Sequence, residues 1–197
     1  MEAKVLHRHD RAAPRYTSYP TAPHFTPEVD AACYRAWLEA LDPALPLSLY
    51  FHIPFCDSLC WFCGCNTTVV RRYEPVANYL QRLKSEVETI ARILGGRRRV
   101  SHVHFGGGSP SLLVPEDWRR LFAQLHSAFA IAEDAEIAVE IDPRDLPEKN
   151  VAALAEVGIN RASFGVQDFD ADVQKAINRI QPFDMTARMV DVFRAHG

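Results

Sequence analysis

Four of the five cysteines lie within ten residues and could together bind a metal centre. Cys56, Cys60, Cys63 and Cys65 have the spacing C-x3-C-x2-C-x-C, and Cys33 lies apart from them. Disulfides are a poor interpretation, because a chain of this size with five cysteines does not resemble a small disulfide-stapled scaffold. Structural zinc sites prefer two separated C-x2-4-C pairs, and a second separated pair is missing. Soft thiolates suit zinc and iron–sulfur clusters alike, so the ligand type leaves both open.

The cysteines follow a predicted buried strand. Residues 47–53 form a short apolar run of β-formers bounded by prolines, which is typical of such a strand. The cysteine loop would therefore leave the C-terminal end of the strand, where ligands bind in parallel α/β sheets and barrels. A cluster held there by three cysteines would leave one iron open to a substrate group.

A glycine triplet follows the next predicted strand. Residues 100–105 run directly into Gly106, Gly107, Gly108, Ser109 and Pro110. Glycines permit positive φ and let a ligand approach the backbone closely. The triplet alone is equally compatible with a flexible turn, so it indicates a ligand site only together with the cysteines.

Polar residues lie in or after the later predicted strands. Glu140 is an acid inside the apolar strand 137–141, and a buried carboxylate needs a partner. A structural ion pair and a functional role explain Glu140 equally well. Gln167 follows the predicted strand 161–166, and Arg179, judged by its local sequence, is a surface residue.

Amphipathic helices are expected between these strands. Apolar residues recur there at steps of three and four, and prolines open several of the segments while glycines close them. On the first helix Cys33 lies on the apolar face, which predicts a small buried side chain rather than a cluster ligand. The alternation of strands and helices predicts an α/β fold with parallel strands. The expected helices cover residues 29–41, 75–94, 115–129, 147–157 and 183–195.

The composition is that of a globular protein. The 197 residues are 48% hydrophobic and 24% charged, with a formal net charge of −3, which gives no indication of nucleic acid or a membrane as a partner. No apolar stretch reaches the roughly 18 residues of a membrane span. The N-terminus lacks the apolar segment of a secretory signal. We therefore predict a cytoplasmic protein, whose thiols stay reduced.

The cysteine motif and its surroundings resemble a known family. C-x3-C-x2-C with an aromatic residue before its last cysteine is similar to the motif of the radical S-adenosylmethionine (SAM) enzymes. The run YFHIPFC at residues 50–56, the fourth cysteine Cys65 and the segment PRYTSYPTA at residues 14–22 resemble the oxygen-independent coproporphyrinogen III oxidases of haem biosynthesis. The resemblance covers essentially the whole chain. It implies that Cys56, Cys60 and Cys63 hold a [4Fe-4S] cluster and leaves Cys65 without an assigned role.

The resemblance also implies a site for one or two SAM molecules. The open iron would bind the amino and carboxylate groups of SAM. Ser109 keeps the hydroxyl of the more usual threonine in the family's GGG(T/S)P motif. Arg179 matches an arginine that meets a SAM carboxylate, which suits its forked guanidinium. The implied contacts are Tyr50, Phe62, Gly107, Gly108, Ser109, Glu140, Gln167 and Arg179, although strand and loop packing would equally explain Tyr50 and Phe62.

The implied architecture is a partial TIM-like (β/α) barrel, of which this chain holds about four βα units. An extended N-terminal arm and a helix would occupy residues 1–46, and the first part of the radical SAM barrel residues 47–197. The chain ends where a fifth strand should begin, so we expect a truncated form of the family enzyme that is inactive alone.

The implied reaction is the anaerobic oxidative decarboxylation of coproporphyrinogen III to protoporphyrinogen IX. The reduced cluster would cleave SAM to methionine and a 5′-deoxyadenosyl radical, which would take a hydrogen from the propionate carbon β to the carboxylate. A flavodoxin- or ferredoxin-like electron donor and a monomeric state are expected. Because the substrate carries carboxylates, Arg15 in the arm is a candidate contact. Two alternatives remain, a haem-binding chaperone that keeps the cluster and an inactive metal-binding fragment.

Overall fold

The computed structural model describes residues 21–144 and 146–197, and the chain divides into two compact units, Met1–Ala40 and Leu41–Gly197. Arg15 and most of the PRYTSYPTA segment lie outside the described residues. The described part of the first unit holds a 3₁₀ helix, Ala22–His24, and α2, Ala31–Glu39.

The helix α2 begins at a side-chain cap. Asp30 Oδ1 accepts hydrogen bonds from the backbone N–H groups of Ala32 and Cys33 at 3.0 and 2.8 Å, which satisfies two of the free donors of the first turn. The predicted helix over residues 29–41 is confirmed at a slightly shorter length. The predicted burial of Cys33 is wrong, because no residue of α2 is buried.

The second unit is built on a four-stranded parallel sheet. Its strands are β1 (Leu47–Ile53), β4 (Arg99–Gly107), β5 (Ala130–Ile141) and β6 (Arg161–Phe164), in the order β1-β4-β5-β6. Each strand of this sheet therefore pairs with the next one along the chain, and all three pairings are parallel. This sequential winding is that of a (β/α) barrel, so the predicted partial barrel of four βα units is confirmed.

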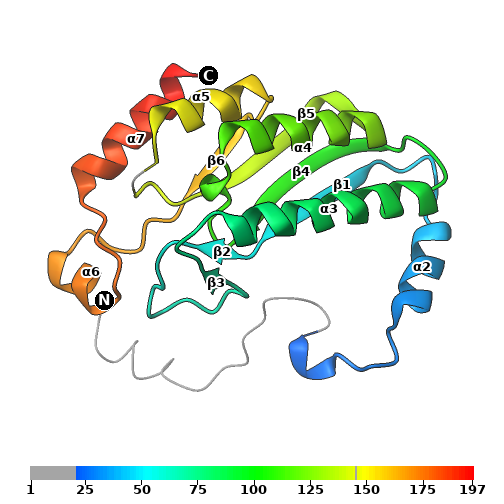
Figure 1. Ribbon diagram of the computed structural model, residues 1–197, viewed down its shortest axis with the longest axis horizontal. Helices are drawn as coiled ribbons and strands as arrows, with labels where there is room; N and C mark the ends of the chain where they lie inside the picture. Colours follow the sequence, from blue (N-terminus) through cyan, green and yellow to red (C-terminus); the bar gives the residue numbers. More distant parts are fainter. Residues whose placement is uncertain (1–20, 145) are drawn as a thin grey trace, which may run out of the picture. The chain divides into compact units, whose positions relative to one another are not determined.

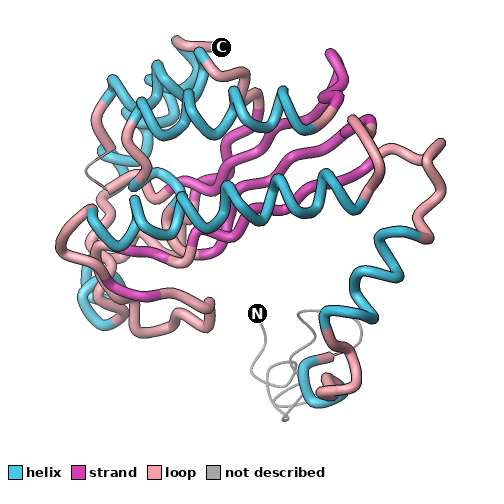
Figure 2. The backbone as a smooth tube through the Cα atoms, turned by 45° about the vertical axis from the view of Figure 1, so that its right-hand side comes forward, coloured by secondary structure: helices cyan, strands magenta, loops and turns pink. Residues whose placement is uncertain are grey.

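A helix follows each strand and covers one face of the sheet (Figure 1). Figure 2 shows the helices lying outside the strands. The helices α3 (Glu74–Ile93) and α4 (Pro115–Ala128) contact each other along their length. Prolines lie in the first turn of both, where the missing N–H costs nothing. The helices are α3 (Glu74–Ile93), α4 (Pro115–Ala128), α5 (Glu148–Glu156) and α7 (Phe183–Ala195).

Short elements escaped prediction. β2 (Phe55–Cys56), β3 (Thr68–Val69), α6 (Ala171–Ala176) and a 3₁₀ turn at Pro110–Leu112 are each too short to show a periodic pattern. β5 also begins at Ala130 rather than at the predicted Ile137.

The hydrophobic core lies between the sheet and its helices. Phe105 of β4 stacks on Phe51 of β1 at 5.0 Å between ring centroids and meets the edge of Trp118 of α4 at the same separation. Phe105 and Trp118 are both fully buried. Side chains alternate between the two faces of a strand, so the opposite face carries Tyr50 and His104, which are exposed or half-exposed. One face of the sheet is thus apolar and the other polar.

Among residues 21–144 and 146–197, no helix is both long and apolar enough to cross a membrane.

Candidate cofactor site

The C-terminal ends of the four strands place the predicted site residues at one edge of the sheet. β1 leads into the cysteine loop, β4 ends in the glycine triplet, β5 ends just before Asp142, and β6 just before Gly165. Because all four strands are parallel, these ends lie side by side. This edge is where open and closed α/β sheets bind ligands.

The cysteine loop is closed at its base by the pairing of β2 with β3. Thr67 Oγ1 donates a hydrogen bond to Cys56 Sγ at 3.2 Å, and the backbone N–H of Cys63 donates to Cys60 O at 3.0 Å. Burial raises the pKa of the Cys56 thiol, and the opposing effect of the Thr67 hydrogen bond does not cancel it. The loop therefore folds back on itself, which brings its thiols to one side.

The same loop is tied to the segment that carries Arg179. Asn178 Nδ2 donates to Leu59 O at 2.7 Å, and the N–H of Trp61 donates to Ile177 O at 3.0 Å. Asn178 has a φ of 54°, a left-handed conformation that asparagine tolerates better than most residues. Asn178, which directly precedes Arg179, thus anchors the cysteine loop.

The glycine triplet packs against the start of the cysteine loop. The N–H groups of Gly108 and Ser109 donate to Ile53 O and Phe55 O at 2.8 and 2.6 Å. A Cβ atom on Gly108 would lie 2.4 Å from Phe55 O, and Gly107 has a φ of 108° with the His52 ring 2.5 Å from where a Cβ would be. Glycine is required at position 108 because the Phe55 backbone fills the space of a side chain, and at position 107 because the backbone has a positive φ.

Glu140 has the partner that its place in a strand requires. Its Oε1 lies 3.2 Å from His104 Nε2, and its Oε2 accepts the N–H of Gly107 at 3.2 Å. The side chain is 46% exposed, so it is less buried than the apolar strand suggests. Tyr50 stacks on His104 at 5.8 Å and bonds His52 Nδ1 through its hydroxyl at 3.0 Å. Burial first, and then the charge of Glu140, raise the pKa of Tyr50.

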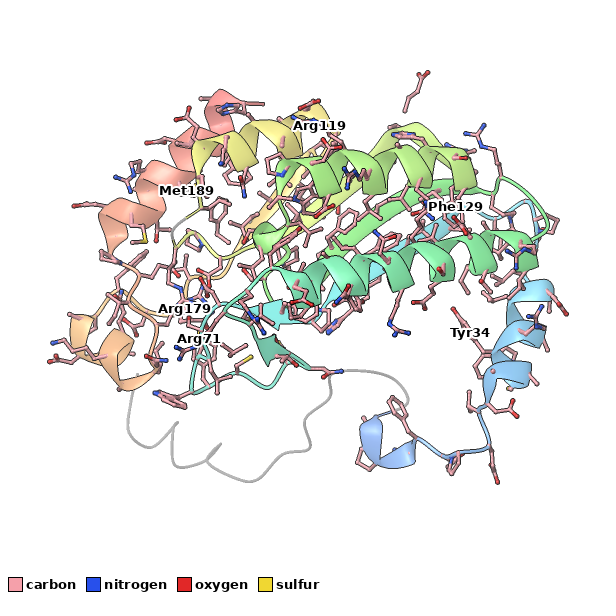
Figure 3. The ribbon with its side chains drawn as sticks, in the orientation of Figure 1. Tyr34, Arg71, Arg119, Phe129, Arg179 and Met189 are labelled. Atoms are coloured by element: carbon pink, nitrogen blue, oxygen red, sulfur yellow. The ribbon has the colours of Figure 1, made fainter. Side chains whose placement is uncertain are left out.

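Arg179 is buried in the floor of the site rather than at the surface (Figure 3). Its Nε donates to Gln181 Oε1 at 2.9 Å and its Nη2 to Gly165 O at 2.8 Å. Its Nη1 bonds Asp142 Oδ2 at 3.0 Å and Cys60 Sγ at 3.6 Å. The surface position suggested by its local sequence is therefore wrong, and the guanidinium points at the predicted cluster loop.

Asp142 and Arg144 belong to this site, although the sequence analysis did not single them out. Arg144 Nε and Nη2 donate hydrogen bonds to the Asp142 carboxylate at 2.9 and 2.6 Å, and Nη2 also lies 3.7 Å from Cys60 Sγ. Burial alone would raise the pKa of Asp142, but the Arg144 hydrogen bonds and the Arg179 charge outweigh it and hold the pKa below its usual range. The signal that could have found them is the run Asp-Pro-Arg directly after a predicted strand.

These elements enclose a pocket of about 240 Å³. Two predicted site residues, Tyr50 and Ser109, do not line it. The Ser109 hydroxyl is buried and bonds Ser111 Oγ at 3.0 Å, and Tyr50 lies on the polar face of the sheet. The predicted residues that do line the pocket are Cys56, Cys60, Cys63, Phe62, Gly107, Gly108, Glu140, Gln167 and Arg179, together with Cys65, Asp142 and Arg144.

The donor set of the pocket fits an iron–sulfur cluster better than a single metal ion. Within the described part of the chain, no three His, Cys, Asp or Glu side chains stand close enough together to hold one ion. A cluster instead takes its thiolates one per iron, spread around its outside. Four thiols on one pocket, three of them in the C-x3-C-x2-C motif, provide such ligands, and two guanidiniums lie beside Cys60.

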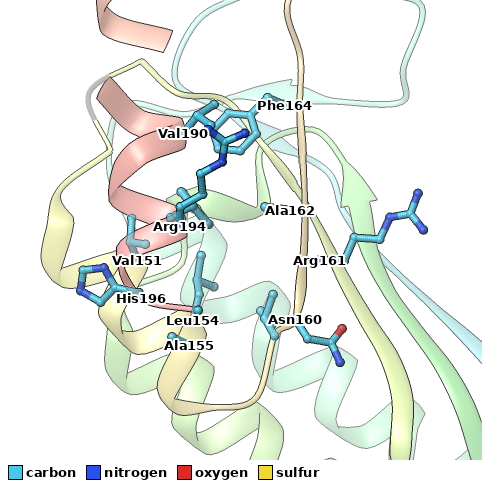
Figure 4. Close-up of a pocket in the computed structure, with 13 residues that line it drawn as sticks. Val151, Leu154, Ala155, Asn160, Arg161, Ala162, Phe164, Val190, Arg194 and His196 are labelled. Atoms are coloured by element: carbon cyan, nitrogen blue, oxygen red, sulfur yellow. The ribbon is translucent and has the colours of Figure 1, made fainter. Parts of the chain in front are cut away.

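A second pocket lies away from the cysteines. It has a volume of about 300 Å³ and an apolar lining between β6, α5 and α7 (Figure 4). Val151 and Leu154 come from α5, Phe164 from β6, and Phe193 from α7. Its lining contains no cysteine and none of the predicted site residues, so we assign the chemistry to the cysteine pocket.

The chain belongs to the Radical SAM superfamily, whose sequence pattern matches residues 50–197. The cofactors of that superfamily, a [4Fe-4S] cluster and SAM, agree with the thiols and the glycine loop of the pocket. The fold also superposes on the solved structure of coproporphyrinogen III oxidase from Escherichia coli, described as a radical SAM enzyme, with a TM-score of 0.87 and 38% identity.

Curated relatives extend the likeness along the chain. An oxygen-independent coproporphyrinogen III oxidase of Bradyrhizobium diazoefficiens is 52% identical over 184 residues, which are 93% of this chain and 41% of the relative. One of Paracoccus denitrificans is 47% identical over 188 residues, 95% of this chain and 42% of the relative. The Escherichia coli structure is covered to 43% of its chain, against 98% of this one. The chain thus spans about two fifths of the length of the relatives it matches.

Proposed function

We propose that this chain provides the cluster-binding and SAM-binding part of an oxygen-independent coproporphyrinogen III oxidase. The observation that carries the proposal is the pocket in which three cysteines, the glycine loop and Arg179 converge. The 52% identity to a relative of that name supports the choice of reaction within the superfamily. The haem-chaperone alternative has no comparable support among the relatives reported above.

The proposed ligands divide the work within the pocket. Cys56, Cys60 and Cys63 would hold a [4Fe-4S] cluster, because they are the thiols of the radical SAM motif and line one pocket. When bound, the cluster and SAM supply the one-electron chemistry that removes a hydrogen atom from a propionate of coproporphyrinogen III. The chain's own residues bind, orient and shield these groups.

SAM would be oriented by the backbone and by charged side chains. Gly107 and Gly108 line the pocket without side chains, and Arg179 offers a cationic guanidinium that suits a carboxylate. Four of the five Arg179 N–H groups have partners within the described residues, so its direction is fixed before a ligand arrives. Glu140 is a candidate for a cationic group of SAM, and Phe62 and Gln167 line the same pocket. Tyr50 and Ser109 would act from outside the pocket, Ser109 by shaping the glycine loop.

A low-potential donor of flavodoxin or ferredoxin type would reduce the cluster, and we propose a cytoplasmic monomer with residues 1–46 as an arm and helix ahead of the barrel. The reduced compartment is supported by the free thiols among the described residues.

A chimera tests the proposal directly. Residues 1–197 of this chain would replace the matching part of the Bradyrhizobium diazoefficiens relative, and the chimera would be reconstituted anaerobically with iron, sulfide, SAM and a reductant. We expect conversion of coproporphyrinogen III to protoporphyrinogen IX, together with 5′-deoxyadenosine, at a rate within about tenfold of the relative's, a difference of 1.4 kcal/mol in the barrier.

The matched control is the same chimera carrying Cys60→Ser, which should lose both products. A folded, cluster-loaded chimera that makes 5′-deoxyadenosine but no vinyl product would contradict the proposed substrate. One that makes neither would contradict the SAM site.

A further inference from the structure

Arg144 is fixed beside a predicted cluster ligand by contacts within its own turn. Its backbone N–H donates to Asp142 Oδ1 at 3.1 Å, and its Nε donates to Oδ1 and Oδ2 of the same carboxylate at 2.9 and 3.1 Å. The side chains of Arg144 and Asp142 are only 14% and 16% exposed. The guanidinium therefore has little freedom, and its Nη2 faces Cys60 Sγ at 3.7 Å.

Both groups that donate hydrogen bonds to the Cys60 sulfur are cationic. Two guanidiniums, of Arg144 and Arg179, lie within 3.7 and 3.6 Å of its sulfur, and one carboxylate, of Asp142, is shared between them. Charge interactions are strong at such a site because water screens buried groups poorly. Cys60 itself is buried. A thiolate at this position would thus receive two N–H donors, both from guanidinium groups.

Hydrogen bonds to cluster sulfurs and nearby charge are two of the factors that set the reduction potential of an iron–sulfur cluster. Adding one electron increases the negative charge beside Arg144, so its cation stabilises the reduced form more than the oxidised form. We propose that Arg144, held in place by Asp142, raises the reduction potential of a cluster bound at Cys56, Cys60 and Cys63. The inference rests on the proposed function only in requiring that cluster, and it involves neither SAM nor the porphyrinogen.

The role differs from that assigned to Arg179. Arg179 is the residue matched to a SAM carboxylate contact, and besides Gln181 its partners Cys60, Asp142 and Gly165 come from three other segments of the chain. Arg144 has its carboxylate partner two residues away, so its position does not depend on a bound ligand. It is therefore suited to act on the cluster before SAM binds.

A redox titration without SAM or substrate tests the inference. The parent chain and Arg144→Gln would be reconstituted anaerobically with iron and sulfide and poised at the midpoint potential of the parent. The ratio of reduced to oxidised cluster would be measured by electron paramagnetic resonance. We expect the ratio to fall at least tenfold in Arg144→Gln, which for a one-electron couple is a shift of 59 mV. Arg144→Lys keeps the positive charge but loses the bidentate hydrogen bonds to the Asp142 carboxylate. We therefore expect the ratio of reduced to oxidised cluster to fall about threefold in this variant.

The matched control is Arg161→Gln, since Arg161 pairs with Glu136 in an exposed bridge at 2.8 Å and does not line the pocket with the cysteines. Its ratio should equal that of the parent. Ratios within twofold of the parent in both Arg144 variants would overturn the inference. If Arg144→Gln takes up no iron, an unchanged ratio in Arg144→Lys overturns it.

The two proposals fail in different ways. A folded parent chain that takes up no cluster would overturn the proposed function and this inference together. A loaded parent whose Arg144 variants keep its potential would overturn this inference alone.

Discussion

Asp142 is the carboxylate that compensates the two guanidinium charges of the site. It pairs with Arg144 and Arg179 at 2.6 and 3.0 Å, and its own side chain is only 16% exposed. Breaking a buried ion pair by removing one partner costs more than the pair contributes, because a charge is left buried without compensation. Asp142 therefore stabilises the fold mainly by keeping two guanidiniums satisfied.

We expect Asp142→Asn to lower the free energy of unfolding of the metal-free chain by about 3 kcal/mol at pH 7. Folding holds the Asp142 pKa below its unfolded value of about 3.9, so the carboxylate stabilises the fold above that pH. The contribution is lost as the pH falls through the lower folded pKa. The difference in the free energy of unfolding between parent and variant should therefore shrink below about pH 4. Urea unfolding at pH 7 and at pH 3 would measure this difference.

The control for this prediction is Asp134→Asn. Asp134 pairs with Arg99 at 3.7 Å with both side chains well exposed, and such pairs contribute only about 0 to 1 kcal/mol. A loss in Asp142→Asn that is the same at both pH values would show that the effect is one of packing and not of charge.

At the scale of elements, the cysteine loop is positioned by neighbours on two sides. The glycine triplet at the end of β4 supports its start, and the turn after α6 anchors its middle through Asn178 and Leu59. The loop has only two two-residue strands of its own. Its conformation therefore depends on contacts between elements more than on its own backbone pairing.

We expect Gly108→Ala to displace the cysteine loop, because the added Cβ would meet Phe55 O at 2.4 Å. The cost is about 3 kcal/mol of stability, typical of overpacking against backbone. Iron bound per chain after reconstitution should fall in parallel, since Phe55 directly precedes Cys56.

Gly158→Ala provides the comparison. Gly158 has a φ of 91° and open space around it, so the substitution should cost about 1–2 kcal/mol through the backbone alone. Its iron content should match that of the parent. Equal iron content in Gly108→Ala would mean that the glycine loop does not position the cysteines.

For the whole molecule, stability and chemistry lie on opposite sides of the sheet. The aromatic cluster of Phe51, Phe105, Trp118 and Phe122 fills the helix-covered face. The opposite face carries Tyr50, His104 and Glu140 and leads to the pocket edge. A substitution in the aromatic core should therefore change stability without touching a residue that lines the cysteine pocket.

We expect Trp118→Ala to lower the free energy of unfolding by about 3–5 kcal/mol, because it empties a fully buried site against Phe105. Trp61→Ala makes the same change at a side chain that is 67% exposed on the cysteine loop, and should alter stability by less than about 0.5 kcal/mol. Denaturant unfolding of both metal-free variants measures the difference. Similar losses in the two would contradict the placement of the core.

The sequence alone determined the class of fold, and its resemblance to a known family indicated the kind of cofactor. Alternating apolar runs and amphipathic segments predicted the parallel strands and all four long helices of the barrel, because these patterns are set by interactions a few residues apart. The cysteine spacing indicated the radical SAM superfamily, and the structure brought those cysteines to the predicted edge of the sheet.

Only the tertiary structure decided how the site is assembled. Arg144 and Arg179 meet Cys60 across 84 and 119 residues of chain, and no local pattern encodes such a separation. Strand register decided that Tyr50 lies outside the pocket and that His104 reaches Glu140. The physical reason is that ion pairs and hydrogen bonds between elements depend on how strands align and loops pack, whereas helix and strand formation depends on near neighbours.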